Sequence, residues 1–115
     1  LVAWSGSFTD EHITSFIYQR FELMSLYAHA AYIGGADAPL YLAELAALQL
    51  RVNMNEEAVK TSDLCLQLTH DNSDAYIIKG LALVQLKRKA EALSCFEKAK
   101  ELGDDRAEGY IKKYK

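Results

Sequence analysis

Five side chains of this sequence are of types that bind metals or act as nucleophiles and bases: His12, His29, His70, Cys65 and Cys95. A zinc site or a nucleophile–base pair needs such residues at short, characteristic spacings, such as two histidines one helical turn apart. Here the histidines are far apart in the sequence, and the cysteines form no CxxC pair. We therefore predict no metal site, and we expect both cysteines to be small core residues.

Motifs of the common enzyme classes are also missing from the sequence. It contains no glycine-rich phosphate-binding loop, no GxGxxG and no GxSxG. The acids Glu56 and Glu57 are better explained as residues of a helix start, where negative charge is favourable, than as an acid–base pair. We predict a protein that is not an enzyme and that uses no cofactor.

The composition favours a single domain of packed helices. Half of the 115 residues are hydrophobic, and there are only one proline and six glycines. The formal net charge of −3 argues against a nucleic-acid partner. The charge is uneven: residues 1–38 contain Arg20 and four acids, whereas residues 87–115 contain nine basic and six acidic residues. We interpret the basic end as a solvated surface.

No signal peptide or membrane span is predicted. The most apolar run, Leu23–Ile33, contains Ser25 and His29 and is shorter than the ~20 residues that a span needs. Because the sequence starts at Leu1 and not at a methionine, we expect a fragment of a longer protein, without that protein's targeting signals. The sequence slightly favours the cytoplasm and otherwise leaves the compartment open.

The N-terminal third is predicted to form a tail and one long helix. The tail, residues 1–8, contains Trp4, which we expect to pack on the helix. The helix covers residues 9–33, with Thr9 as its cap and the pair Gly34-Gly35 as its stop. Its second half is apolar on nearly every side, so we expect neighbours on more than one side. The apolar positions are Ile13, Phe16, Ile17, Phe21, Met24, Ala28 and Ala31, joined by Leu23, Leu26, Ala30 and Ile33.

The rest of the sequence is predicted to form two equivalent helical hairpins and a final helix. Residues 73–106 align with residues 39–72 at an offset of 34 positions. The turns within the hairpins are expected at residues 53–55 and 87–89, with Asn55 capping the next helix and Gly103 ending the last. Residues 105–114 are expected to form an amphipathic capping helix.

The two hairpins resemble tetratricopeptide (TPR) repeats, and the similarity covers roughly two thirds of the chain. The second copy has the family's pattern of large, aromatic and small residues at Tyr76, Lys79, Gly80, Leu83, Ala92, Phe96 and Ala99. The first copy matches less well, with Leu42, Leu45, Ala46, Gln49, Ala58, Ser62 and Cys65. The family's late proline is replaced by His70 and Asp104. A weaker similarity to Sel1-like repeats is seen at residues 99–108. The resemblance implies an all-α fold, a short TPR-like α-solenoid of antiparallel helix pairs.

The resemblance also implies a function as a protein-interaction module, a scaffold or adaptor. In this family the first helices of successive pairs line a concave groove that takes a peptide or helix. The corresponding positions here are Leu40, Ala43, Ala47, Leu50, Asp74, Ile77, Leu81 and Val84. Because these residues are mostly apolar, they favour an apolar peptide or amphipathic helix over the carboxylate that some family members clamp with Lys, Arg and Asn.

Several alternatives remain open from the sequence. The groove suits a small TPR chaperone for secreted or assembled subunits, and the domain also suits an accessory part of a larger enzyme. The long first helix is itself an apolar ligand of the right kind. It could fill the groove of its own chain, or join two chains in a homodimer.

Overall fold

The computed structural model describes residues 10–115, and side chains from residue 21 onward. Within this range the chain is all-helical, as predicted, and contains no strand. The predicted tail with Trp4, the Thr9 cap and the side chains of Ile13, Phe16 and Ile17 lie outside the described part. The elements are α1 (Asp10–Ile33), the short 3₁₀ helix η1 (Gly35–Asp37), α2 (Ala38–Arg51), α3 (Asn55–Leu68), α4 (Ser73–Gln85), α5 (Lys89–Glu101) and α6 (Asp105–Tyr114).

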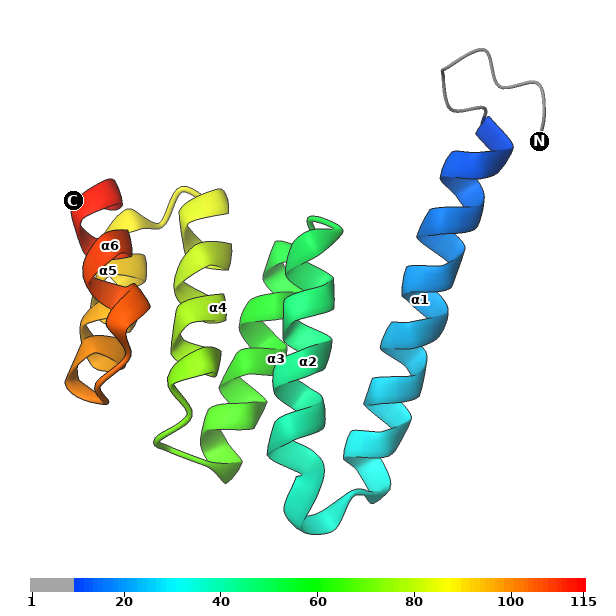
Figure 1. Ribbon diagram of the computed structural model, residues 1–115, viewed down its shortest axis with the longest axis horizontal. Helices are drawn as coiled ribbons and strands as arrows, with labels where there is room; N and C mark the ends of the chain where they lie inside the picture. The colour runs from blue at the N-terminus through cyan, green and yellow to red at the C-terminus, as the bar shows by residue number, and fades with distance from the viewer. Residues whose placement is uncertain (1–9) are drawn as a thin grey trace.

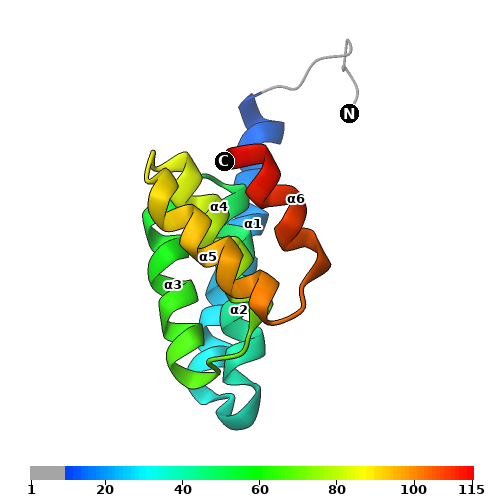
Figure 2. The same cartoon turned by 90° about the vertical axis from the view of Figure 1, so that its left-hand side faces the viewer.

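Helices that are neighbours in sequence are also neighbours in space. Each helix packs against the one before and the one after it, and α2 also touches α4. The helices stand side by side with alternating direction along the longest of the three dimensions, 51 × 37 × 22 Å (Figure 1). Seen along the stack, α3 lies on the left and α6 on the right, and α5 runs obliquely between them (Figure 2). The described residues thus form a helical, repeat-like stack.

The turns that join α2 to α3 and α4 to α5 have the same geometry. Asn53 and Lys87, 34 positions apart, are the two non-glycine residues with positive φ among the described ones, at 63° and 65°. After each, a backbone N–H reaches back five residues: Met54 to the Gln49 carbonyl (2.8 Å) and Arg88 to the Leu83 carbonyl (2.9 Å). This left-handed ending satisfies carbonyls that a helix terminus leaves free. The α2–α3 and α4–α5 hairpins, which follow each other in the sequence, therefore share the same turn geometry.

The largest core cluster lies in the second hairpin and α6. Phe96 is fully buried there, and its ring stacks on Tyr110 and Tyr114 of α6, with centroids 5.3 and 6.0 Å away. Gly80 makes room for this ring, since a Cβ at position 80 would lie 2.5 Å from a ring carbon of Phe96. The amphipathic capping role predicted for residues 105–114 therefore has a packing basis, because α6 covers Phe96.

The helix ends agree with the sequence in part. α1 stops before Gly34, and Gly103, with φ of 89°, follows α5 as expected. Asn72 and Asp104 cap α4 and α6 by accepting hydrogen bonds from the Ala75 and Arg106 amides, at 3.1 and 3.0 Å. The cap predicted at Asn55 is wrong. Asn55 is the first residue of α3, and its buried Oδ1 has no hydrogen-bond partner.

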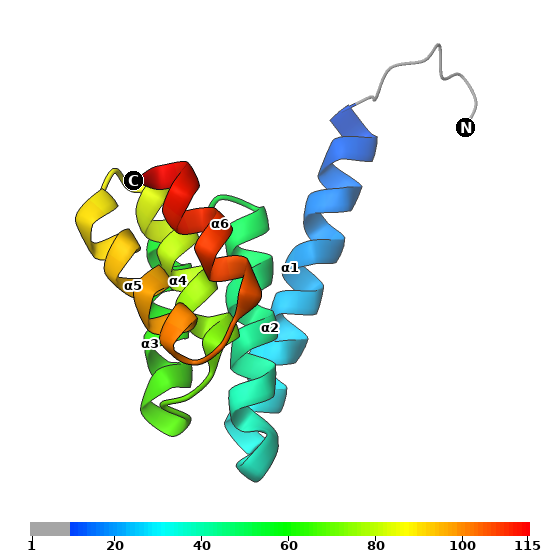
Figure 3. The ribbon, with the colours of Figure 1, turned by 60° about the vertical axis from the view of Figure 1, so that its left-hand side comes forward.

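Within the described chain α1 packs on one side, against α2 and the adjoining η1, so a neighbour on a second side would have to come from outside this chain. Met24 is buried against Leu45 and Leu48 of α2, with Tyr27 packed beside them. Away from this contact Leu26 and Ile33 are 66% and 67% exposed. The start of α1 diverges from α2 and extends past the other helices (Figures 1 and 3). Nothing in the described chain covers the outer side of α1.

Candidate functional site

The predicted groove residues lie on α2 and α4, the first helices of the two hairpins. Both helices follow a turn that reverses the chain, so they run in the same general direction and touch each other (Figure 1). Leu40 and Asp74 stand near the starts of these helices, and Leu50 and Val84 stand near their ends. The structure therefore brings the two halves of the predicted lining onto adjacent elements.

The exposure of the lining differs between α2 and α4. On α2, Leu40 is 60% exposed and Ala47 and Leu50 are half-buried, whereas Ala43 is buried beside Cys65 and Ala75. On α4, Ile77 is only 3% exposed and belongs to the core cluster around Phe96.

The remaining apolar positions of α4 are Leu81 and Val84. Both are half-buried and pack against the same cluster as Ile77. The accessible apolar surface is thus provided mainly by α2. The buried residues of the predicted lining, Ala43 and Ile77, belong to the core between the helices.

An ion-pair cluster occupies one end of this surface. The Arg106 guanidinium contacts the Asp74 carboxylate of α4 and lies 2.7 Å from Oδ2 of Asp104. The hydrogen bond from Arg106 lowers the pKa of Asp104 to about 2, and both carboxylates raise the pKa of Arg106. Asp74 and Arg106 are 32 positions apart, about one repeat, but the sequence alone gave no reason to pair them. The cluster connects α6 to α4 and pairs the Asp74 carboxylate with a cation of the same chain.

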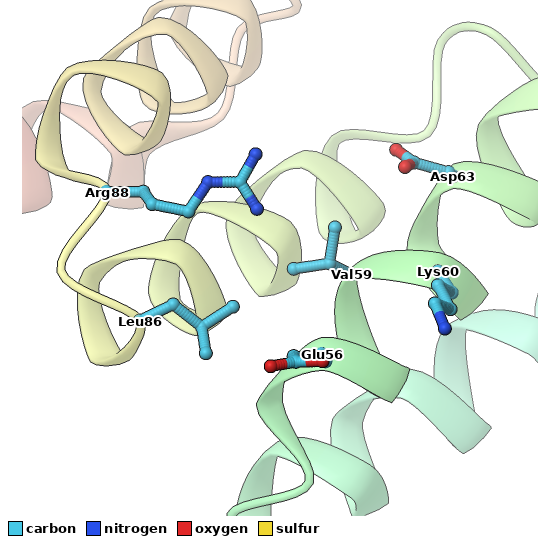
Figure 4. Close-up of a pocket in the computed structure, with 6 residues that line it drawn as sticks. All are labelled: Glu56, Val59, Lys60, Asp63, Leu86 and Arg88. Atoms are coloured by element: carbon cyan, nitrogen blue, oxygen red, sulfur yellow. The ribbon is translucent and has the colours of Figure 1, made fainter.

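A second concavity lies on the α3 side of the stack. It has a volume of about 570 Å³ and lies between α3 and the turn from α4 to α5 (Figure 4). Its lining consists of Glu56, Val59, Lys60 and Asp63 of α3, and of Leu86 and Arg88. Two of its charges already have partners, because Asp63 pairs with Lys79 at 2.7 Å and Arg88 with Glu91 at 2.6 Å. The sequence did not single out this cleft, whose residues come from two hairpins.

Both cysteines are buried and free, as the sequence predicted for small core residues. The Cys65 thiol donates a hydrogen bond to the Pro39 carbonyl at 3.3 Å and accepts one from the side-chain Nδ2 of Asn72 at 3.4 Å. Burial raises the pKa of both thiols. Because the thiolate is the reactive form of cysteine, a raised pKa lowers the reactivity of both thiols. Cys65 instead connects the start of α2 to the link between α3 and α4.

The histidines, which could act as metal ligands or bases, are dispersed over the chain. His29 and His70 are exposed on α1 and on the α3–α4 link, and the side chain of His12 lies outside the described part. His70 borders a shallow hollow of about 180 Å³ with Tyr76, Lys98, Glu101 and Leu102. In the part of the chain that the structure describes, no three His, Cys, Asp or Glu residues are grouped as a metal would require. No described helix is long and apolar enough to cross a membrane.

No family model matches this chain, and no curated protein and no solved structure was found to be similar to it. Its function is therefore inferred from its own residues.

Proposed function

We propose that this chain is a TPR-like protein-interaction module without catalytic activity, a scaffold or adaptor that holds an apolar peptide or helix. The observation that supports this most is the turn repeated at Asn53 and Lys87. Their separation of 34 positions equals the length of a TPR unit, and their backbone hydrogen bonds correspond residue by residue. Equal turns hold α2 and α4 in equal relation to their partner helices, which is what a groove built from first helices requires.

The chemistry of the exposed positions supports an apolar ligand. Leu40, Ala47 and Leu50 of α2 present apolar surface, and the adjacent α4 adds the half-buried side chains of Leu81 and Val84. The charged groups of Asp74 and Arg106 stand at one end and neutralise each other. An amphipathic helix laid on this surface would bury its apolar side there and leave its charged side in water.

The test is a binding titration with an 18-residue amphipathic peptide of leucine and lysine, labelled with fluorescein and followed by anisotropy. The variants Leu40→Glu and Ala47→Glu each place a charge in the proposed contact. We expect each to weaken peptide binding at least tenfold, because the new carboxylate would be desolvated under the peptide. The control is Leu64→Glu, which changes a similarly exposed leucine on α3. This variant should bind the peptide as tightly as the wild type does.

All three variants add one negative charge, so general attraction of the basic peptide cannot produce the expected difference. Thermal unfolding should be similar in the wild type, Leu40→Glu and Leu64→Glu because both leucines are exposed, and the same measurement checks that Ala47→Glu, at a half-buried position, remains folded. A wild type that does not bind the peptide, or an equal loss in Leu64→Glu, would contradict the proposal. Suppressed aggregation of an unfolded subunit by the wild type, in addition to peptide binding, would favour the chaperone alternative.

A further inference from the structure

The outer side of α1 carries an apolar seam, which we define as Leu23, Leu26, Ala30 and Ile33. These residues are spaced by three, four and three positions, the spacing of side chains that pack between two helices in a coiled coil. Leu23 is 39% exposed, and Leu26 and Ile33 are about two-thirds exposed. The neighbouring side of α1 is already engaged, because Met24 and Tyr27 pack on α2. The seam is therefore a complete helix-packing surface without a partner in this chain.

We propose that the seam is the interface of a symmetric dimer, in which the α1 helices of two copies pack antiparallel. A two-fold axis between positions 26 and 30 would set Leu23 opposite Ile33 of the second copy, and Leu26 opposite its Ala30. The large side chain of one helix then faces the small one of the other, which is how helix surfaces interdigitate. The surface is self-complementary, as an isologous interface must be.

The charges of α1 support both the choice of a second copy and the direction of pairing. Residues 23–33 contain no Asp, Glu, Lys or Arg, so this half of the helix can face its own copy without repulsion. The acids Asp10, Glu11 and Glu22 all precede it, together with one base, Arg20, so that the first half of α1 has a net negative charge. Antiparallel pairing places the two acidic halves at opposite ends of the interface. A parallel pair would set each acid beside its own copy, where like charges repel.

This dimer is independent of what the groove holds, since the seam lies on α1 and the groove residues on α2 and α4. Its test is the molar mass of the 115-residue chain by sedimentation equilibrium between about 1 and 200 µM. We expect the wild type to approach twice its monomer mass of 12.9 kDa. The double variant Leu26→Glu/Ile33→Glu should raise the dimer dissociation constant at least tenfold. The matched control, Leu64→Glu/Leu68→Glu on α3, changes two exposed leucines in the same way and should dimerise normally.

Unchanged helical circular dichroism would show that the variants remain folded, as expected for exposed positions. The pairing is overturned if the wild type is monomeric throughout the range, in which case the seam is left for a different protein. It is also overturned if the seam variant still dimerises. A mass that keeps rising with concentration would mean open, end-to-end association and would likewise overturn it.

A charge exchange tests the direction of the helices. Leu23→Glu and Ile33→Lys, each alone, should weaken the dimer. Combined in one chain at low salt, they should restore it, because antiparallel pairing sets each new carboxylate opposite the other copy's new ammonium. In a parallel dimer the same double variant sets Glu against Glu and Lys against Lys. Failure of the double variant to recover association would overturn the antiparallel arrangement.

Discussion

At the scale of single residues, the two hairpins differ in the side chains that pack where their paired helices face each other. In the second, Gly80 is the small residue and Phe96 the large one that occupies the space above it. The equivalent positions of the first hairpin hold Ala46 and Ser62, both fully buried. Ser62 buries an Oγ that has no hydrogen-bond partner. Phe96 therefore gives the second hairpin a larger fully buried side chain at this position than Ser62 gives the first.

The fit between Gly80 and Phe96 gives a stability prediction. A methyl group 2.5 Å from a fully buried ring overpacks the core, at a cost of about 1–3 kcal/mol. Because alanine is favoured over glycine in a helix by about 1 kcal/mol, Gly80→Ala should lower the free energy of unfolding by a net amount of up to about 2 kcal/mol. Gly109→Ala in α6 is the control, since a Cβ there meets open space, and it should stabilise the protein. Urea unfolding measures both, and a stabilised Gly80→Ala would refute the steric argument.

At the scale of elements, the short polar side chains that cap α4 and α6 determine where these helices begin. Asn72 and Asp104 hold equivalent places before the two helices, and each accepts a backbone N–H of the first turn. Asp104 differs in carrying a charge that Arg106 also binds, at 2.7 Å. The start of α6 therefore depends on the ionisation of one carboxyl group, whereas the start of α4 does not.

This ionisation predicts a pH dependence. The pKa of Asp104 is lowered from 3.8 to about 2 in the folded protein, so its stabilising effect is present above about pH 4 and is lost as the pH falls towards 2. Asp104→Asn keeps an acceptor for the cap but does not titrate. We expect the wild type to exceed this variant in stability at neutral pH, and the difference to shrink between pH 4 and 2. A difference that stays constant across this window in urea unfolding would contradict the assignment.

The sequence predicted the elements well where local chemistry decides them. Glycine at position 103 and the offset of 34 positions between the hairpins located turns that the structure contains. The cap at Asn55 failed because the turn around the left-handed Asn53 ends at Met54, so that Asn55 is already the first residue of α3.

The sequence assigned the predicted groove residues to two helices that prove to be adjacent, but it did not indicate which of these residues are exposed. Whether Ile77 faces a ligand or the core depends on how α4 is rotated against α5 and α6, which the spacing of apolar residues does not specify. For the same reason the cleft beside Val59 and Leu86 could not be foreseen, because it arises from the packing of one hairpin against the next.

At the scale of the whole molecule, each helix packs mainly against its immediate neighbours. Separate core clusters follow from this arrangement. One contains Met24, Leu45 and Leu48 at the α1–α2 end, and another surrounds Phe96 and Ile111 at the α5–α6 end. In such a stack, stability is close to a sum over units and their interfaces, so that the two ends can open independently.

Independence of the two ends is testable by hydrogen exchange of the full chain. Ile111→Ala removes a buried side chain of the cluster around Phe96, at a cost of about 2–5 kcal/mol. We expect faster amide exchange in α4, α5 and α6, with little change in α1 and α2. Leu48→Ala at the other end should give the opposite pattern, because Leu48 packs with Met24 and Leu45. If either variant accelerated exchange equally in all helices, the chain would be a single cooperative unit and the nearest-neighbour description would be wrong.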